Sequence, residues 1–316
     1  MAIFSKAHLS AGWLATAFQG DGVSAVQVSR PPATQPVVEW LAFYPAEPAA
    51  SAAQLERLCR EARAERCHCT TMLADGEYQI MTVDAPNVPP EELKTAIRWR
   101  LKDMLDYHID DATIDVIDIP ADKNAPTRNR SMFAIAARNQ VVQQKQEAFA
   151  KAKIPLSVID VPEMAQRNIA ALLEPEGRGL ALLSFDDDGA LLTLTHGGEL
   201  YVSRRIDMPL AQLVRGDEAS RNEACDRITL ELQRSLDHFD RQFHFITLAK
   251  LVLGPIGEGG TGLQRYLADN LHLQVELLDV GSIFDISRTP SLRDIVSQQR
   301  FFLTLGAALR HEEKVL

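Results

Sequence analysis

The sequence predicts an α/β protein built from two lobes that share one plan. Strands and helices alternate, with a crossover of roughly 20 residues between strands, as in a βαβ unit. A meander of three strands, a helix and a βαβ unit occur in both halves, which indicates an internal duplication although no residue-level repeat accompanies it. The length of 316 residues, at roughly 150 residues per domain, also suggests two domains.

The first predicted elements form a strand meander followed by a helix and two more strands. Asp21-Gly22 is a strong hairpin signal between the first two strands, and the proline-rich segment 30–36 has the composition of a loop. Residues 51–66 are alanine-rich with apolar side chains at helical spacing. The expected bounds are strands at 12–18, 23–29 and 37–43, a helix at 51–66, and strands at 67–73 and 78–83.

The residue pattern of segment 91–120 predicts an amphipathic helix followed by a strand. Pro89 and Pro90 open the helix, because proline is tolerated in a first turn where its missing N–H would be unpaired anyway. The helix dipole favours the negative charges of Glu91 and Glu92 there. The strand is predicted at 114–119, and the apolar stripe of the helix contains Leu93, Ile97, Leu101, Met104 and Leu105.

The rest of the chain repeats this alternation after a polar loop at 121–130. The Pro/Gly-containing segment 174–179 is the best candidate for a boundary between the lobes. The predicted strands are 131–137, 156–161, 180–185, 190–195, 200–206, 248–253 and 275–278. The predicted helices are 140–153, 162–173, 223–243, 263–271 and 298–310.

Composition narrows the functional classes. A hydrophobic content of 46% and a charged content of 24% are typical of a globular chain with an ample core. The net charge of −10 disfavours binding to nucleic acid or an anionic membrane through bulk electrostatics. The N-terminus lacks the apolar core of a signal peptide, and no apolar run is long enough to predict a membrane span. The four cysteines are expected to be reduced, buried thiols of a cytoplasmic protein.

No catalytic or metal-binding constellation emerges from the residues. In a strand, Cys67 and Cys69 face one way and His68 the other, so they cannot converge locally on one ion. The eight histidines show no triad or metal spacing. The acidic run 186–188 is expected to be a solvated turn, and the three tryptophans form no stacking ladder for single-stranded nucleic acid.

Several segments resemble, in the same order, motifs of the PilM family, the actin-like cytoplasmic proteins of type IV pilus machines. They are PEELKTAIRWRL (90–101), FAIAARNQVV (133–142), IPLSVIDVPEMA (154–165), LELQRSLDHF (230–239), LVLGPIGEGGTGL (251–263) and LGAALR (305–310). Within this family the chain is most similar to the MshI branch of mannose-sensitive haemagglutinin (MSHA) pilus biogenesis. The cytoplasmic domain of GspL from type II secretion is a relative, but GspL continues into a transmembrane helix and a periplasmic domain, and we expect neither in this protein, which favours the pilus branch.

The resemblance implies an actin-like (ASKHA, ribonuclease H-like duplicated) α/β fold with a small inserted α+β subdomain. The first actin-like subdomain is expected at 1–83 and 131–173, together with the C-terminal helix at 298–316. The inserted subdomain is expected at 84–130 and the second lobe at 174–297.

The resemblance also places a nucleotide cleft, which we expect to be degenerate. Active relatives carry an Asp-x-Gly step in each of two phosphate hairpins, and these align with Ser10-Ala11-Gly12 and Ser184-Phe185-Asp186. The glycine-rich loop at 254–262 aligns with the adenosine-binding element, so the expected cleft residues are Gly12, Gly257, Gly259 and Gly260. Two interpretations of this loop remain open. It could bind nucleotide without turnover, or its glycines could serve only a tight turn with no ligand present. We therefore expect a pseudo-ATPase rather than an enzyme, with a nucleotide-driven switch or weak ATPase as the alternative.

The function implied by the resemblance is that of an assembly scaffold. The chain is expected to capture the cytoplasmic N-terminal tail of a PilN-like or MshJ-like inner-membrane protein, and to couple it to the assembly platform and its motor ATPase. It would thus be cytoplasmic and peripheral to the inner membrane, with a GspL-like role in secretion as the alternative. The expected groove residues are Ile97, Trp99, Arg100, Leu101, Asp115 and Asp118, although Ile97 and Trp99 could instead be subdomain core.

Overall fold

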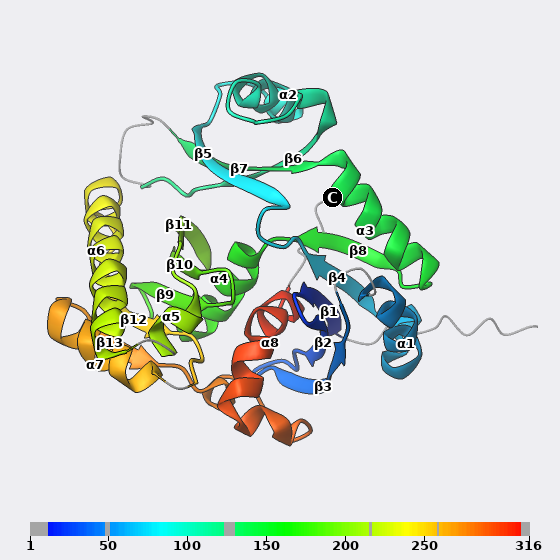
Figure 1. The fold of residues 1–316 in the computed structure, drawn as a ribbon. Coiled ribbons are helices and arrows are strands. Elements are labelled where there is room, and N and C mark those ends of the chain that lie inside the picture. Colours follow the sequence, from blue (N-terminus) through cyan, green and yellow to red (C-terminus); the bar gives the residue numbers. More distant parts are fainter. Residues whose placement is uncertain (1–11, 48–50, 123–129, 215–216, 258, 311–316) are drawn as a thin grey trace, which may run out of the picture.

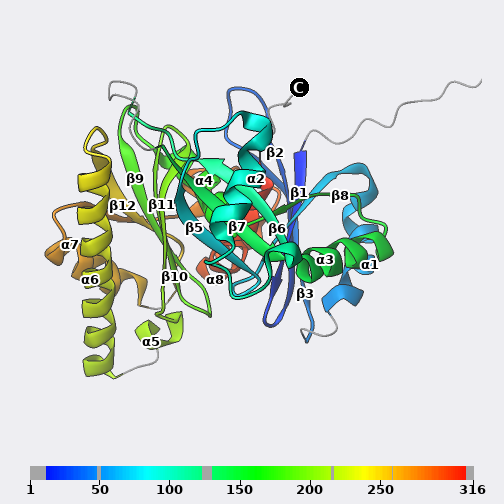
Figure 2. The same cartoon turned by 90° about the horizontal axis from the view of Figure 1, so that it is seen from above.

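The computed structural model describes residues 12–47, 51–122, 130–214, 217–257 and 259–310. Two five-stranded sheets with the same strand order form the two lobes (Figures 1 and 2). The first has the order β3-β2-β1-β4-β8 and the second the order β11-β10-β9-β12-β13. In each, the leading strands form an antiparallel meander and the later ones pair in parallel, so the structure shows the duplication at the level of topology.

The strand bounds follow the predicted ones closely. In the first sheet they are β1 (Gly12–Gln19), β2 (Gly22–Ser29), β3 (Val37–Pro45), β4 (His68–Met72) and β8 (Leu156–Asp160). In the second they are β9 (Gly179–Phe185), β10 (Ala190–His196), β11 (Glu199–Ile206), β12 (Leu248–Leu253) and β13 (Gln274–Leu277).

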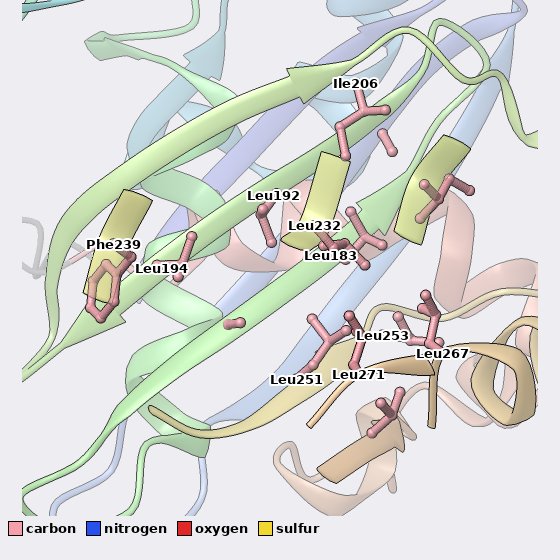
Figure 3. Packing of buried hydrophobic residues seen from close by; sticks show 14 of the residues in the cluster. Leu183, Leu192, Leu194, Ile206, Leu232, Phe239, Leu251, Leu253, Leu267 and Leu271 are labelled. Atoms are coloured by element: carbon pink, nitrogen blue, oxygen red, sulfur yellow. The ribbon is translucent and has the colours of Figure 1, made fainter. Parts of the chain in front are cut away.

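Each sheet buries its outer face under helices of its own lobe. The first sheet is covered by α1 (Ser51–Ala62) and α3 (Asn139–Lys151), with Leu14 and Phe149 in their shared core. The second is covered by α6 (Glu218–Gln242) and α7 (Gly260–Asn270). Figure 3 shows this second core, in which leucines of β9, β10 and β12 meet side chains of both helices.

The inner faces of the two sheets are covered by exchanged helices. Helix α4 (Pro162–Leu173) follows the last strand of the first sheet but packs on β9, β10 and β11 of the second. Helix α8 (Ile295–Ala308) follows the second sheet but packs on β1, β2 and β4 of the first. The two helices cross at Gly306, where an added Cβ would lie 2.1 Å from the carbonyl oxygen of Ala165. The lobes therefore share one core along this crossing.

The third sheet is a separate three-stranded layer that sits across the two lobes (Figure 1). It contains β5 (Tyr78–Asp84), β6 (Ala112–Asp118) and β7 (Ser131–Arg138) in the antiparallel order β5-β7-β6. Helix α2 (Pro90–Leu101) covers one face, with Ile97 and Leu101 fully buried against it. This layer is the inserted α+β subdomain.

One strand is grouped differently from the expectation. The segment 131–137 was expected to belong to the first lobe, but β7 is the central strand of the inserted sheet and pairs on both sides, with β5 and β6. Strand β5 also belongs to this sheet, so the inserted sheet spans 78–138 rather than 84–130. The short apolar strand β7 is buried on both faces in either arrangement, and its sequence therefore does not identify its neighbours.

Short elements account for the other differences. Helix α5 (Leu210–Val214) and the 3₁₀ turns Val280–Ser282 and Pro290–Arg293 were not predicted, because a single turn shows no periodicity. Helix α6 begins at Glu218, five residues before the expected start, where the Asp217 carboxylate accepts a hydrogen bond from the Ser220 N–H at 2.8 Å. No helix among the described residues is long and apolar enough to cross a bilayer.

The crossing at Gly306 yields a stability prediction. Gly306→Ala places a methyl group against the Ala165 carbonyl, and overpacking of this kind lowers the free energy of unfolding by about 1–3 kcal/mol. The matched control is Gly262→Ala in α7, where nothing lies within 4 Å of the added methyl, and alanine should stabilise the helix by up to about 1 kcal/mol. Urea unfolding of both variants checks this. Equal stability of Gly306→Ala and wild type would contradict the close crossing.

Candidate functional site

A cavity of about 590 Å³ lies where the inserted sheet meets the two lobes. Strands β6 and β7 form one wall, β8 and α4 the opposite one, and the β10–β11 turn and the end of α8 complete the enclosure. Elements from all three sheets therefore meet at this cavity.

The alternation of β6 explains how one strand serves both a core and a cavity. Ile114 and Val116 point to the core beneath α2, whereas Thr113, Asp115 and Ile117 line the cavity. Strand β7 follows the same rule, because Met132 and Ala134 pack beneath α2 while the alternate positions 135 and 137 line the cavity.

The cavity has an apolar floor and a charged rim. The floor is a small hydrophobic cluster: Leu73, Ile135, Ala137, Val142, Ile159, Val161 and Met164. On the rim, Arg310 Nη1 lies 2.8 Å from Asp160 Oδ2, and Asp115 Oδ1 lies 2.8 Å from Lys94 Nζ. Arg30 Nη1 donates to the Leu309 carbonyl at 2.8 Å, and Arg167 Nη1 donates to the Gly198 carbonyl at 2.9 Å. Such a site suits a ligand with both apolar and polar groups.

Next to the floor, a buried polar contact joins the inserted sheet to α4. The Tyr78 hydroxyl on β5 lies 2.8 and 2.7 Å from the two carboxyl oxygens of Glu163, whose side chain is buried. Burial raises the pKa of Glu163, although the Tyr78 hydrogen bond and the nearby Arg205 guanidinium act in the opposite direction. Burial, with Glu163 beside it, also holds the pKa of Tyr78 far above its ordinary value.

Arg205 extends this contact into the second lobe. Its Nε lies 3.3 Å from Asp75 Oδ1, and its Nη1 lies 3.3 Å from Asp186 Oδ2 in the β9–β10 turn. Arg205 also acts to lower the pKa of both Tyr78 and Glu163, so polar and charged groups extend from that turn to the Tyr78–Glu163 contact.

The residues expected to bind a partner are not gathered in one place. Asp115 lines the cavity, but Ile97 and Leu101 are fully buried between α2 and the inserted sheet. Trp99 is 72% exposed on α2, outside the cavity lining, with the Lys102 ammonium 5.9 Å from its ring centroid. The two remaining candidates make local contacts: Arg100 Nη1 donates to the Asp84 carbonyl at 2.8 Å, and Asp118 Oδ1 lies 3.4 Å from Arg130 Nη2.

Sequence reasoning missed the cavity residues on β7, β8 and α4. Ile135, Ile159 and Arg167 come from segments far apart in the chain, and only the tertiary fold brings them together. The one usable signal was the polar–apolar alternation of β6 over residues 113–116, in which Thr113 and Asp115 line the cavity.

At the second hairpin, the groups that could bind a phosphate are already hydrogen-bonded within the protein. Asp186 Oδ1 accepts hydrogen bonds from the backbone N–H groups of Asp188 and Gly189, at 3.0 and 2.8 Å. Ser184 is buried, and its hydroxyl donates to Gln166 Oε1 at 2.6 Å. The turn thus binds its own carboxylate, and the serine belongs to the core.

At the first hairpin, the sequence alignment was misplaced. Gly12 lies at the start of β1, at the opposite end of the strand from the β1–β2 turn, and Ser10 and Ala11 lie outside the described residues. An added Cβ at Gly12 would lie 2.2 Å from the Val28 carbonyl oxygen, so strand packing accounts for this glycine. The residues that lead into the turn are Ala17-Phe18-Gln19, which contain no aspartate.

The glycine-rich loop is explained in part by its own geometry. Gly259 has φ +91° at the start of α7, a conformation that favours glycine. Gly260 packs against Ile256, whose Cβ lies 3.2 Å from the site of an added methyl group. Gly257 has open space, because the nearest atom to an added Cβ is Gln299 Oε1 at 4.0 Å. Glu258, between them, lies outside the described residues.

Comparison with solved structures identifies the fold. No protein-family model and no curated protein sequence matches this chain. The chain is similar to a structure of a PilM-PilN type IV pilus biogenesis complex, with 24% identity, a TM-score of 0.72, and coverage of 95% of this chain and 98% of that one. A Bacteroides thetaiotaomicron protein with an actin-like ATPase fold and unknown function has 11% identity, a TM-score of 0.50, and coverage of 93% and 99%.

A third structure, the cytoplasmic domain of EpsL from the Vibrio cholerae type II secretion system, has 14% identity, a TM-score of 0.47, and coverage of 83% and 96%. The first two similarities confirm the predicted fold class, an actin-like α/β fold.

The buried contact of Glu163 predicts a pH dependence of stability. Burial raises the folded-state pKa of Glu163 above its unfolded value of about 4.3, so the carboxyl stabilises the fold most at low pH. That contribution is lost as the pH rises through the raised pKa. Glu163→Gln cannot ionise and keeps an oxygen to accept the Tyr78 hydrogen bond. The stability of this variant relative to wild type should therefore increase between about pH 4 and about pH 8.

Urea unfolding at both pH values measures this change. Glu61→Gln is the matched control, because Glu61 also accepts from a tyrosine, Tyr44, at 2.7 Å, while its pKa is lowered, mainly by hydrogen bonds from Arg57 and Tyr44. Its relative stability should fall over the same interval. A Glu163→Gln difference that does not change with pH would contradict the buried-carboxyl account.

Proposed function

We propose that this protein is a cytoplasmic scaffold of a type IV pilus assembly platform, of the MSHA type. It binds the N-terminal cytoplasmic tail of a PilN-like or MshJ-like inner-membrane protein in the cavity between the inserted sheet and the lobes. The similarity to a PilM structure solved with PilN, over nearly the whole of both chains, supports this proposal. Through that partner the protein is held at the inner membrane and coupled to the motor ATPase.

The cavity itself is the observation that carries the proposal. It is bordered by two strands that each lie at the edge of a sheet, β6 and β8. Edge strands have backbone groups free to pair with an extended peptide, and the apolar floor provides contacts for alternate side chains of such a segment. A short extended tail fits these features better than a compact ligand.

We further propose that the protein does not turn over nucleotide. The residues that lead into the first turn, Ala17-Phe18-Gln19, contain no aspartate, and the N–H groups of the second turn already bind the Asp186 carboxylate. A phosphate placed there would meet that carboxylate, with Asp187 and Asp188 beside it, and like charges repel. A nucleotide-driven switch is the second candidate, and the open space at Gly257 favours it.

The tail should bind with a Kd on the order of 10 µM, as measured by isothermal titration calorimetry with a synthetic peptide. Ile135→Ala removes part of the apolar floor and should weaken binding about tenfold, because a buried aliphatic side chain contributes about 1.5–3 kcal/mol. Trp99→Ala is the matched control, since Trp99 does not line the cavity and its loss should leave affinity unchanged.

Tails from pilus and from type II secretion proteins should be titrated in parallel, because tighter binding of a secretion tail would favour the GspL-like alternative. Absence of binding by every tail, or a loss with Trp99→Ala but not with Ile135→Ala, would refute the proposed site.

A fluorescent ATP analogue with Mg²⁺ tests the nucleotide site. We expect no binding at sub-millimolar concentration, because the N–H groups of Asp188 and Gly189 in the second turn already bind the Asp186 carboxylate. Gly257→Asp is the diagnostic variant, since the position has room for a side chain and the change adds negative charge. Binding to wild type that Gly257→Asp abolishes would contradict this expectation and favour the nucleotide-driven switch.

A further inference from the structure

The cavity presents two guanidinium groups that no described carboxylate neutralises, Arg30 and Arg167. We propose that these groups recognise an acidic side chain, so that the cavity selects an extended peptide carrying aspartate or glutamate beside its apolar residues. This inference rests on the proposed function for the place of binding and adds the chemistry of the bound segment.

Arg167 is held at the cavity by a turn that requires glycine. Gly197 and Gly198 have φ of +60° and +77°, and the Gly198 carbonyl accepts from Arg167 Nη1. The Nε of Arg167 is buried without an acceptor among the described residues. A buried donor without a partner is uncommon in folded proteins, and an arriving carboxylate can satisfy such a guanidinium.

Arg30 lies in the first lobe, directly after β2, and also lines the cavity. Its Nη1 donates to the carbonyl of Leu309 at the end of α8, which fixes the head group at the rim. A guanidinium carries five donors, and each of these arginines makes one hydrogen bond among the described residues, to a backbone carbonyl. Donors of the planar fork therefore stay available for a carboxylate.

The acidic residues of the rim are already paired or exposed. Asp160 is bound to Arg310 and Asp115 to Lys94, while Glu199 is exposed. The lining is therefore locally positive at Arg30 and Arg167, in a chain whose net charge is −10. Charge complementarity at this rim favours an acidic over a basic segment.

The two arginine bonds could also serve only to hold the turn and the end of α8. That structural role predicts lost stability without charge selectivity, whereas recognition predicts that the arginine and the peptide acid depend on each other. A double-mutant cycle between them separates the two roles.

The test is a selection of random dodecapeptides, displayed on phage, against the full chain. The tightest peptide and its analogue with each acid replaced by the amide are then titrated into wild type, Arg167→Met and Arg178→Met. Arg178 is the matched control, because its Nη2 also donates to a backbone carbonyl, that of Leu248 at 2.7 Å, but it does not line the cavity.

We expect the selected peptides to contain an acid near apolar residues. The amide analogue should bind wild type and Arg178→Met about 10- to 100-fold more weakly than the acid, and bind Arg167→Met no more weakly than the acid does. Arg30→Met serves in the same cycle should Arg167→Met fail to fold.

The inference would be overturned if no peptide is recovered or if the selected peptides contain no acid. It would also be overturned if replacing the acid by the amide weakens binding to Arg167→Met as much as it weakens binding to wild type. If acidic peptides bind but no PilN-like tail does, the proposed function fails and the inference stands. If a tail binds without coupling to either arginine, the inference fails and the proposed function stands.

Discussion

The close crossing of α4 and α8 is the constraint on which the rest of the molecule depends. Gly306 lets the two exchanged helices approach until the Ala165 carbonyl fills the space of a side chain, and this fixes each sheet against the other. Neighbouring polar residues of α4 then form hydrogen bonds to different elements of the fold. Their partners are Tyr78 on β5 for Glu163, Ser184 and the second sheet for Gln166, Gly198 for Arg167, and Gly306 for Asn168.

This arrangement distinguishes the cavity from the second hairpin. At the second hairpin the polar groups bind one another: the Asp186 carboxylate accepts hydrogen bonds from the N–H groups of its own turn, and Ser184 bonds within the core. At the cavity, strand edges, partly buried apolar side chains and two unneutralised guanidinium groups remain available. Unused binding capacity is therefore concentrated at the cavity, and this is where we place the protein's function.

The sequence allowed most of the fold to be predicted but only a small part of the site. Long elements with clear periodicity, such as β9 and α6, were found because burial dictates their pattern. The neighbours of β7 could not be known, since a strand buried on both faces has no distinguishing alternation. Asp115 was identified through the resemblance of its segment to the family, whereas Arg167 lies on an amphipathic helix where an arginine is unremarkable in sequence. Its importance follows from contacts between segments far apart in the chain.

The most direct test of this account is hydrogen exchange of the full chain, followed by mass spectrometry, with the partner tail and separately with Mg-ATP. Backbone amides at the edge strands β6 (Ala112–Asp118) and β8 (Leu156–Asp160) should exchange more slowly when the tail is present, because an added strand would pair with them. Mg-ATP should leave exchange at the β9–β10 turn and in the loop before α7 unchanged. Protection of that turn and loop by Mg-ATP, with no tail-dependent protection of β6 or β8, would contradict the account.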